Sequence, residues 1–293
     1  MSFDIAGFIS TAHRVRDEDV EYDAFRDRPL SPQALRTLRY MSDVESYTIC
    51  YLRDLLVTPS HQDPEITAFL TMWAYEEFWH GEALDQVLRA HGQRADYQHI
   101  RTVRQRQGFL DRIAPIHQAI AGGLIGDDYI AVHMSWGAIN EWSAHSAYAR
   151  LMEREDHPEL TRLLRRIQTQ ETRHLAFYNS QARDRLEASG RARKVTRFAL
   201  KSFWSPVGSG IEPVPETRFV LNYLMAGPVG EKSIDRLDRK VDTLPGQEGL
   251  SLVARAAGKF GVGPLAHLAD RPRRRLLRTV GAALQPARLT AGF

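Results

Sequence analysis

Two segments of the sequence have the pattern Glu-x-x-His. The first contains Glu77 and His80, and the second contains Glu171 and His174. Residues three positions apart lie on one face of an α-helix, so each segment directs a carboxylate and an imidazole to the same point. These side chains are ligands for divalent transition metals. Each pattern alone is weak evidence for a metal site, and its position in the chain makes the evidence stronger.

Two single glutamates occupy the middle of apolar helical segments. Glu45 is expected to share a face with Leu38, Met41, Ile49 and Leu52, and Glu141 with Met134, Ala138 and Tyr148. Burying four ionised carboxylates together is strongly unfavourable unless cations neutralise them. The order Glu, Glu-x-x-His, Glu, Glu-x-x-His is the ligand pattern of ferritin-like di-iron and di-manganese carboxylate bundles. The sequence therefore predicts a site for two divalent metal ions.

Oxygen ligands together with two imidazoles favour iron or manganese over zinc or copper, and we predict two iron ions. Glu77 and Glu171, each paired with its own histidine, are expected to bridge the two metals. The remaining ligands of the separate metal positions would be Glu45 with His80, and Glu141 with His174.

Other polar residues near these motifs are not expected to be ligands. Glu76 points about 100° away from Glu77 on a helix, and Glu82 also lies off that face. We expect both to be outer groups around the ligands or surface groups. His133 and His145 are expected to be core or surface histidines. The nearby aromatic residues are expected mostly to pack, namely Tyr47, Tyr51, Tyr75, Tyr129, Tyr148, Trp73, Trp79, Trp136 and Trp142.

Four long segments have apolar residues at helical spacing and position these ligands. They are expected to begin at Ser31-Pro32, Asp63-Pro64, Asp127 or Asp128, and His157-Pro158, and to end near Thr58, His91, Asp156 and Gly190. The connection from Gln93 to Ile125 is expected to contain a short helix near Phe109 to Ala121 and a break at Gly122-Gly123. Short, long and short connections predict an antiparallel four-helix bundle with one crossover.

The sequence thus predicts an all-α protein in three parts. Residues 1–30 form an N-terminal segment, residues 31–190 a ferritin-like four-helix bundle, and residues 191–293 a basic helical appendage that packs on the bundle. Residues 1–190 carry a net charge of −7 and residues 191–293 a net charge of +10. A positive field attracts anionic partners. Candidate contact residues are Arg191, Arg193, Lys194, Arg197, Lys201, Arg271, Arg273, Arg274, Arg275 and Arg278.

Composition excludes several classes of protein. The 293 residues contain one cysteine, Cys50, so neither an intrachain disulfide nor a Cys-x-x-Cys site can form. We find no secretory signal at the N-terminus and no apolar run of about 18 residues that could span a membrane. These features predict a cytoplasmic protein without a transmembrane segment.

The motifs resemble those of soluble acyl-acyl-carrier-protein desaturases. The segment from Trp73 to Leu84 is similar to the family segment Trp-x-x-Glu-Glu-Asn-Arg-His-Gly, and Gln170 to His174 is similar to Asp-Glu-x-Arg-His. Glu45 and Glu141 stand where the family has its two single glutamates. The resemblance covers about residues 30–190.

This resemblance implies a di-iron enzyme of fatty acid metabolism that reduces O2 and removes hydrogens from an acyl chain. It implies an acyl substrate carried on acyl carrier protein, a ferredoxin-type electron donor and a homodimer. Both partner proteins are acidic in this family, so the resemblance implies a docking role for the basic C-terminal part.

Three positions depart from the family pattern. Phe78 and Trp79 replace its Asn-Arg, Gln170 replaces an aspartate that steadies a ligand, and Ala144 replaces a threonine associated with handling oxygen. Two alternatives therefore stay open. One is another di-iron oxygenase or hydroxylase acting on a small hydrophobic substrate, and the other is non-enzymatic iron binding of the ferritin type.

Related di-iron classes and nucleic-acid binding are less consistent with the sequence. Leu84 stands where a ribonucleotide reductase small subunit would have its radical tyrosine, and Ile167 stands where an arylamine N-oxygenase would have a third histidine. A rubrerythrin would need more cysteines. The arginines from Arg271 to Arg278 have no interleaved aromatic residues, so we expect no nucleic-acid partner.

Overall fold

The computed structural model describes residues 3–263, and within them the chain forms α-helices and one 3-10 helix, with no β-strand. The all-α prediction is confirmed for this range. The elements are α1 (Ile5–Thr11), α2 (Ala24–Asp27), α3 (Pro32–Leu55), η1 (Pro59–Gln62), α4 (Pro64–Ala90), α5 (Tyr97–Arg106), α6 (Gly108–Ile125), α7 (Asp128–Glu155), α8 (Pro158–Ala188), α9 (Gly190–Phe203), α10 (Val214–Met225), α11 (Gly227–Val241) and α12 (Leu252–Gly258).

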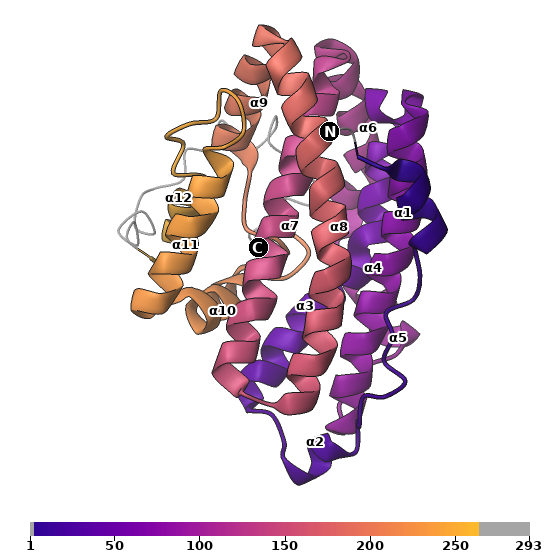
Figure 1. The fold of residues 1–293 in the computed structure, drawn as a ribbon, viewed down its shortest axis with the longest axis vertical. Helices are drawn as coiled ribbons and strands as arrows, with labels where there is room; N and C mark the ends of the chain where they lie inside the picture. The colour runs from indigo at the N-terminus through magenta and orange to yellow at the C-terminus, as the bar shows by residue number, and fades with distance from the viewer. Residues whose placement is uncertain (1–2, 264–293) are drawn as a thin grey trace.

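The four longest helices, α3, α4, α7 and α8, lie side by side (Figure 1), with α3 packed on α4 and α7 on α8. Two of them, α3 and α4, have the expected side-chain caps, whereas Asp127 before α7 makes no capping bond. Ser31 accepts a hydrogen bond from the backbone of Ala34, and Asp63 accepts bonds from Glu65 and Ile66. A proline follows each of these caps, where its missing N–H costs nothing. These local signals explain why the helix starts were predictable.

The connection between α4 and α7 differs from the prediction. It contains two helices, and α6 continues through Gly122 and Gly123 to Ile125, so the predicted break is wrong. Gly122 is needed for packing instead: a Cβ there would lie 2.8 Å from Cδ of Pro59. Removing the side chain lets α6 approach the turn after α3.

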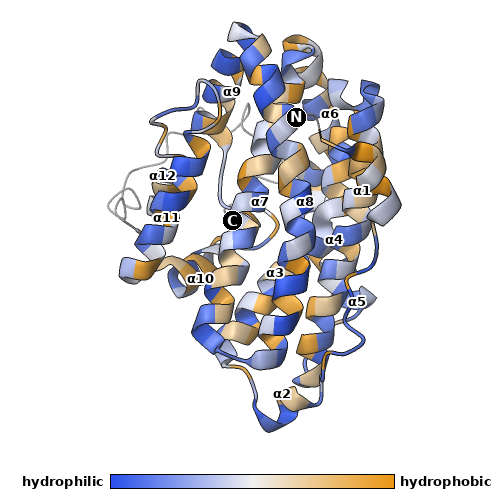
Figure 2. Cartoon of the chain, viewed as in Figure 1, coloured by the Kyte–Doolittle hydropathy of each residue, from blue (hydrophilic) through white to orange (hydrophobic). Residues whose placement is uncertain are grey.

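The bundle helices have apolar and polar faces (Figure 2), and the apolar faces form one core. Leu38 and Met41 of α3 are buried as predicted, but Ile49 is 52% exposed. The predicted inward position of Ile49 is therefore wrong. Glu45, one helical turn before Ile49, is buried. The buried face of α3 therefore includes position 45 but not position 49.

The C-terminal helices cover one side of the long helices. Helix α9 packs on α7 and α8, while α10 packs on α3 and α7 (Figure 1). Some of the basic residues predicted to contact partners make contacts within the chain: Arg191 pairs with Asp128, and Arg197 donates to the backbone of Gly246 and Glu248. The arginines from Arg271 to Arg278 lie outside the described residues. No helix in residues 3–263 is both long and apolar enough to cross a membrane.

Candidate metal centre

The six predicted ligands lie together between the four long helices. Each is at most 7% exposed. Helix α3 contributes one carboxylate, α4 a carboxylate and an imidazole, α7 one carboxylate, and α8 a carboxylate and an imidazole. The residues are Glu45, Glu77, His80, Glu141, Glu171 and His174. Residues up to 129 positions apart in sequence are thus brought into one buried cluster.

The cluster divides into two sets of four ligands that share two glutamates. One set adds Glu45 and His80 to the shared residues, and the other adds Glu141 and His174. In each set the ligand atoms lie within 4.8 Å of one another. The shared residues are Glu77 and Glu171, the two glutamates expected to bridge the metals. This arrangement is compatible with two adjacent metal positions.

Each histidine presents Nδ1 to the cluster and Nε2 to a partner outside it. His174 Nε2 lies 2.7 Å from Glu76 Oε2, which can only accept, so Nε2 carries the proton. His80 Nε2 lies 2.9 Å from Gln170 Oε1 and donates to it. Such outer hydrogen bonds fix the tautomer and the orientation of a ligating imidazole. Both Nδ1 atoms are therefore the nitrogen atoms available to a metal in the cluster.

Glu76 makes several of the hydrogen bonds that surround the candidate ligands. It is fully buried and accepts from Arg173, from the Gln170 amide at 3.0 Å and from the backbone N–H of His13 at 3.2 Å. Sequence reasoning placed Glu76 outside the ligand set but left open whether it was an outer or a surface group. The structure places it against a ligand, and its adjacency to Glu77 gave no direct sign of this.

Two of the aromatic residues that were expected mostly to pack also hydrogen-bond to candidate ligands. Trp73 Nε1 donates to Glu141 Oε1 at 3.1 Å, and the hydroxyl of Tyr148 donates to Glu45. Trp73 precedes Glu77 by one helical turn, and Tyr148 follows Glu141 by two turns. Helical spacing could therefore have placed both on the ligand face, although it could not have identified their partners.

The electrostatics of the cluster are those of crowded carboxylates. Burial, together with the charge of Glu171, raises the pKa of Glu77 and of Glu141 well above their usual value. Burial opposes ionisation of Glu171 as well, but its interactions with His174 and His80 hold its pKa well below the usual value. Burial lowers the pKa of His174, yet its bonds to Glu171 and Glu76 raise it to about 10. Proton uptake by Glu77, Glu141 and His174 is thus favoured, and it reduces the net negative charge of the cluster.

The residues present fit a pair of divalent metals. Glu77 Oε1 and His80 Nδ1 are buried and make no hydrogen bond, although His174 Nδ1 lies 3.1 Å from the first atom and Glu171 Oε1 lies 3.4 Å from the second. Within the described residues, no lysine or arginine forms an ion pair with any of the four carboxylates. Buried charge without a paired cation is costly, and metal ions would supply the missing charge.

Two neighbouring cavities adjoin the cluster. The first, of about 130 Å³, is lined by the four carboxylates. The second, of about 100 Å³, shares Val44, Glu45, Ala144, Pro206 and Val207 with the first. Its wall is mostly apolar and comes from α3, α7 and the C-terminal helices, with Met41, Ala147, Leu221, Leu224, Ile234 and Val253 among its residues. The C-terminal helices thus close an apolar space beside Glu45.

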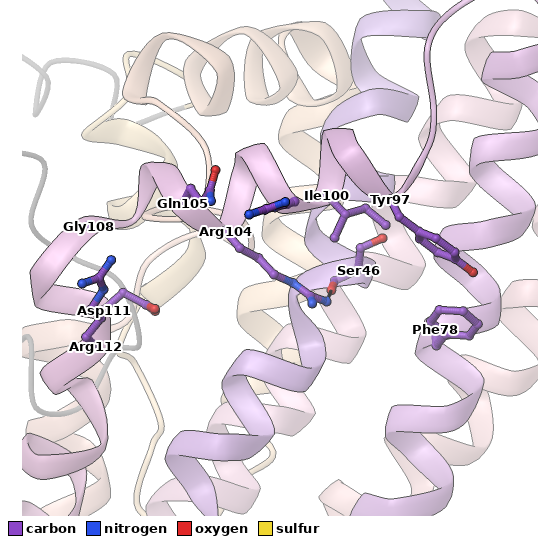
Figure 3. Close-up of a pocket in the computed structure, with 10 residues that line it drawn as sticks. Ser46, Phe78, Tyr97, Ile100, Arg104, Gln105, Gly108, Asp111 and Arg112 are labelled. Carbon is purple, nitrogen blue, oxygen red and sulfur yellow. Dashed lines mark hydrogen bonds between the residues drawn. The ribbon is translucent and has the colours of Figure 1, made fainter.

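The other candidate residues lie outside the cluster. His133 is buried and bonds to Ser60, His145 is half-buried, and Glu82 contacts Arg89. A separate hollow of about 420 Å³ lies at the surface between α5 and the start of α6 (Figure 3). It includes none of the six ligands. The cavities beside the carboxylates are therefore the spaces in which chemistry at the cluster could act.

Comparisons of the chain with models of protein families, with curated proteins and with solved structures found no match.

Proposed function

We propose that this protein is a di-iron, O2-dependent oxidoreductase built on a ferritin-like bundle, and that it desaturates a fatty acyl group carried on acyl carrier protein. One observation carries the proposal. Two four-ligand sets share Glu77 and Glu171, and one of them opens onto an apolar cavity at Glu45. Iron storage would need the ligands but no apolar cavity.

Two irons held by these residues would supply the activation of O2. The overall reaction consumes the acyl chain, O2, two electrons from an external donor and two protons, and yields a carbon–carbon double bond and two water molecules. The substrate thus supplies two of the four electrons that reduce O2, and a ferredoxin-type donor supplies the other two.

The chain's own residues hold the ligands and exclude water. The Tyr148 hydroxyl and the Trp73 indole fix the carboxylates of Glu45 and Glu141. The apolar wall of the second cavity would align methylene groups beside Glu45 and keep bulk water away from them. Both cavities are smaller than the roughly 300–1,000 Å³ of typical ligand pockets, so a long acyl chain requires side chains of α10 and α11 to move apart.

A second candidate is insertion of one oxygen atom into the same chain. Ala144 lines both cavities, and it stands where the desaturases that this sequence resembles have a threonine associated with handling oxygen. We therefore expect residue 144, next to the ligands, to influence whether the acyl chain is desaturated or receives an oxygen atom.

The decisive experiment loads the full-length protein with Fe(II) without oxygen and measures bound iron. We expect about two irons per chain. The loaded protein is then exposed to O2 with a reductant and a panel of acyl carrier protein substrates. Mass spectrometry distinguishes the loss of two hydrogens from the gain of one oxygen. A folded protein that binds less than one iron contradicts the proposal.

Ligand variants test the assignment of the site. Glu171→Ala and His80→Ala should lose iron but keep the helical circular dichroism, because each removes a ligand and leaves the apolar faces intact. His145→Ala is the matched control, since His145 lies on α7 outside both ligand sets. Unchanged iron content in the first two variants would show that other residues bind the metal.

A further inference from the structure

The hydroxyl of Tyr178 is a buried polar group without a hydrogen-bond partner among the described residues. Tyr178 lies on α8 and its side chain is fully buried. The hydroxyls of Tyr47, Tyr129 and Tyr148, which are also buried, each donate to a side chain. Leaving a buried hydroxyl unpaired costs free energy, so the group requires an explanation, and a redox or catalytic role is one.

Tyr178 lies next to the candidate metal ligands. It follows His174 by one helical turn and lines the first cavity, together with the four carboxylates. Its ring meets the indole of Trp73 edge-on, with the ring centroids 5.8 Å apart, and Trp73 donates to Glu141. Phe69 packs edge-on against the same tyrosine ring, with the centroids 5.0 Å apart. A readily oxidised phenol is thus held beside the cluster, among aromatic rings that exclude bulk water.

His133 of α7 offers a proton acceptor next to Tyr178. The two ring centroids are 6.0 Å apart and the ring planes meet at 67°. His133 Nδ1 lies 2.8 Å from the hydroxyl oxygen of Ser60, whereas the buried Nε2 has no partner among the described residues. Burial lowers the pKa of His133 to about 3, so its imidazole is neutral, and burial raises the pKa of Tyr178 well above its usual value, so the phenol keeps its proton. When Nδ1 donates to Ser60, Nε2 carries a free lone pair.

We propose that Tyr178 is redox-active: it gives up one electron when O2 is reduced at the cluster with no acyl chain present, and its hydroxyl proton passes to Nε2 of His133. This inference rests on the proposed di-iron function. O2 takes up four electrons and four protons from solvent and becomes two water molecules. Two bound ferrous ions supply two of the electrons, the external donor one and Tyr178 one, in place of the two that an acyl chain would supply.

The products on the chain are a neutral tyrosyl radical at Tyr178 and an imidazolium at His133. Loss of an electron makes the phenol hydroxyl strongly acidic, so even a weakly basic imidazole accepts its proton. One water molecule between the two polar atoms would carry that proton across. Oxidation is thereby directed to one residue instead of to the metal ligands.

Electron paramagnetic resonance tests the proposal on the full-length protein. The protein is loaded with excess Fe(II), which also serves as the external donor, exposed to O2 without acyl substrate and frozen. We expect an organic radical signal whose hyperfine structure narrows when the protein contains ring-deuterated tyrosine. Tyr178→Phe should abolish the signal but keep about two irons per chain and the stability to urea, because it removes no hydrogen bond to the protein. Tyr129→Phe is the matched control and should keep the signal, since the Tyr129 hydroxyl donates to Gln118 outside the cavities.

The rate of radical formation tests the role of His133. His133→Leu should slow the appearance of the signal by roughly 100-fold, because it removes the proton acceptor. A signal that forms at the wild-type rate in this variant would overturn the proton transfer. Iron content, measured in the same samples, separates this inference from the proposed function. Less than one iron per chain contradicts both, whereas two irons without a tyrosine radical, or a signal that survives Tyr178→Phe, overturns only the role of Tyr178.

Discussion

The two histidines of the cluster have different outer partners. His174 donates to Glu76, a carboxylate, whereas His80 donates to Gln170, a neutral amide. A carboxylate partner makes an imidazole a stronger donor to metal than an amide does. The metal position that includes His174 and Glu141 should therefore bind first and more tightly. The two metal positions have the same types of ligand, so the expected difference in metal affinity comes from the residues that hydrogen-bond to the histidines.

Glu76→Gln tests this difference. Removing the negative charge behind His174 should weaken the tighter of two binding steps by roughly 10- to 100-fold and bring the two steps together. Titration of the metal-free protein with Co(II), followed by visible absorbance, resolves the steps. Glu82→Gln on the same helix is the control. Two unchanged steps in Glu76→Gln would mean that the outer partner does not set the order of binding.

At the scale of helices, α7 and α8 approach closely where they carry ligands. Gly137 of α7 lies against the ring of Tyr178, and a Cβ at this glycine would be 2.3 Å from two ring carbons. Both residues also line the cavity that contains the four carboxylates. The glycine therefore sets the distance between α7, which holds Glu141, and α8, which holds the second Glu-x-x-His motif.

Gly137→Ala should destabilise the protein by about 1–3 kcal/mol, because the added Cβ would overlap the ring of the fully buried Tyr178 and force it to shift. The better helix propensity of alanine offsets only about 1 kcal/mol of this. Urea unfolding followed by circular dichroism measures the change. Gly123→Ala, at a helical glycine in open space, should instead be neutral or stabilising, and a similar loss in both variants would contradict the packing argument.

At the scale of the whole molecule, metal and protons compete to neutralise the buried cluster. The pKa of His174 is raised from 6.5 to about 10 in the folded protein, so its contribution to stability is complete below about pH 6.5 and is lost as the pH rises toward 10. Glu77 and Glu141 act in the same direction, since burial raises the pKa of each. The pKa of Glu171 is lowered, so its contribution to stability is already complete at neutral pH and does not change as the pH rises further.

The metal-free protein should therefore become less stable between about pH 6.5 and pH 9, by on the order of a few kcal/mol. The metal-loaded protein should lose much less, because metal ions have replaced these protons and bind more tightly as competing protons leave. Urea unfolding with chelator or with bound metal, at the two pH values, measures both trends. A metal-free protein that gained stability with rising pH would show that the cluster is not held by protons.

The sequence alone predicted the four long helices and the six clustered residues. Caps such as Ser31 and Asp63 are local, and the periodicity that places Glu77 beside His80 depends only on helix geometry. Burying four carboxylates is costly unless cations neutralise them, so the two motifs and the two single glutamates were expected to gather around metal ions. These inferences needed no knowledge of which helix contacts which.

Only the tertiary structure decided the rest, because it depends on residues far apart in the chain. Gln170 meets His80 across 90 residues, and Tyr148 meets Glu45 across 103. Helix α6 continues through two glycines, which locally favour its end, and Gly122 leaves room there for Pro59, 63 positions earlier in the chain. The apolar cavity exists because the C-terminal helices fold back over α3 and α7, and no local pattern specifies that packing.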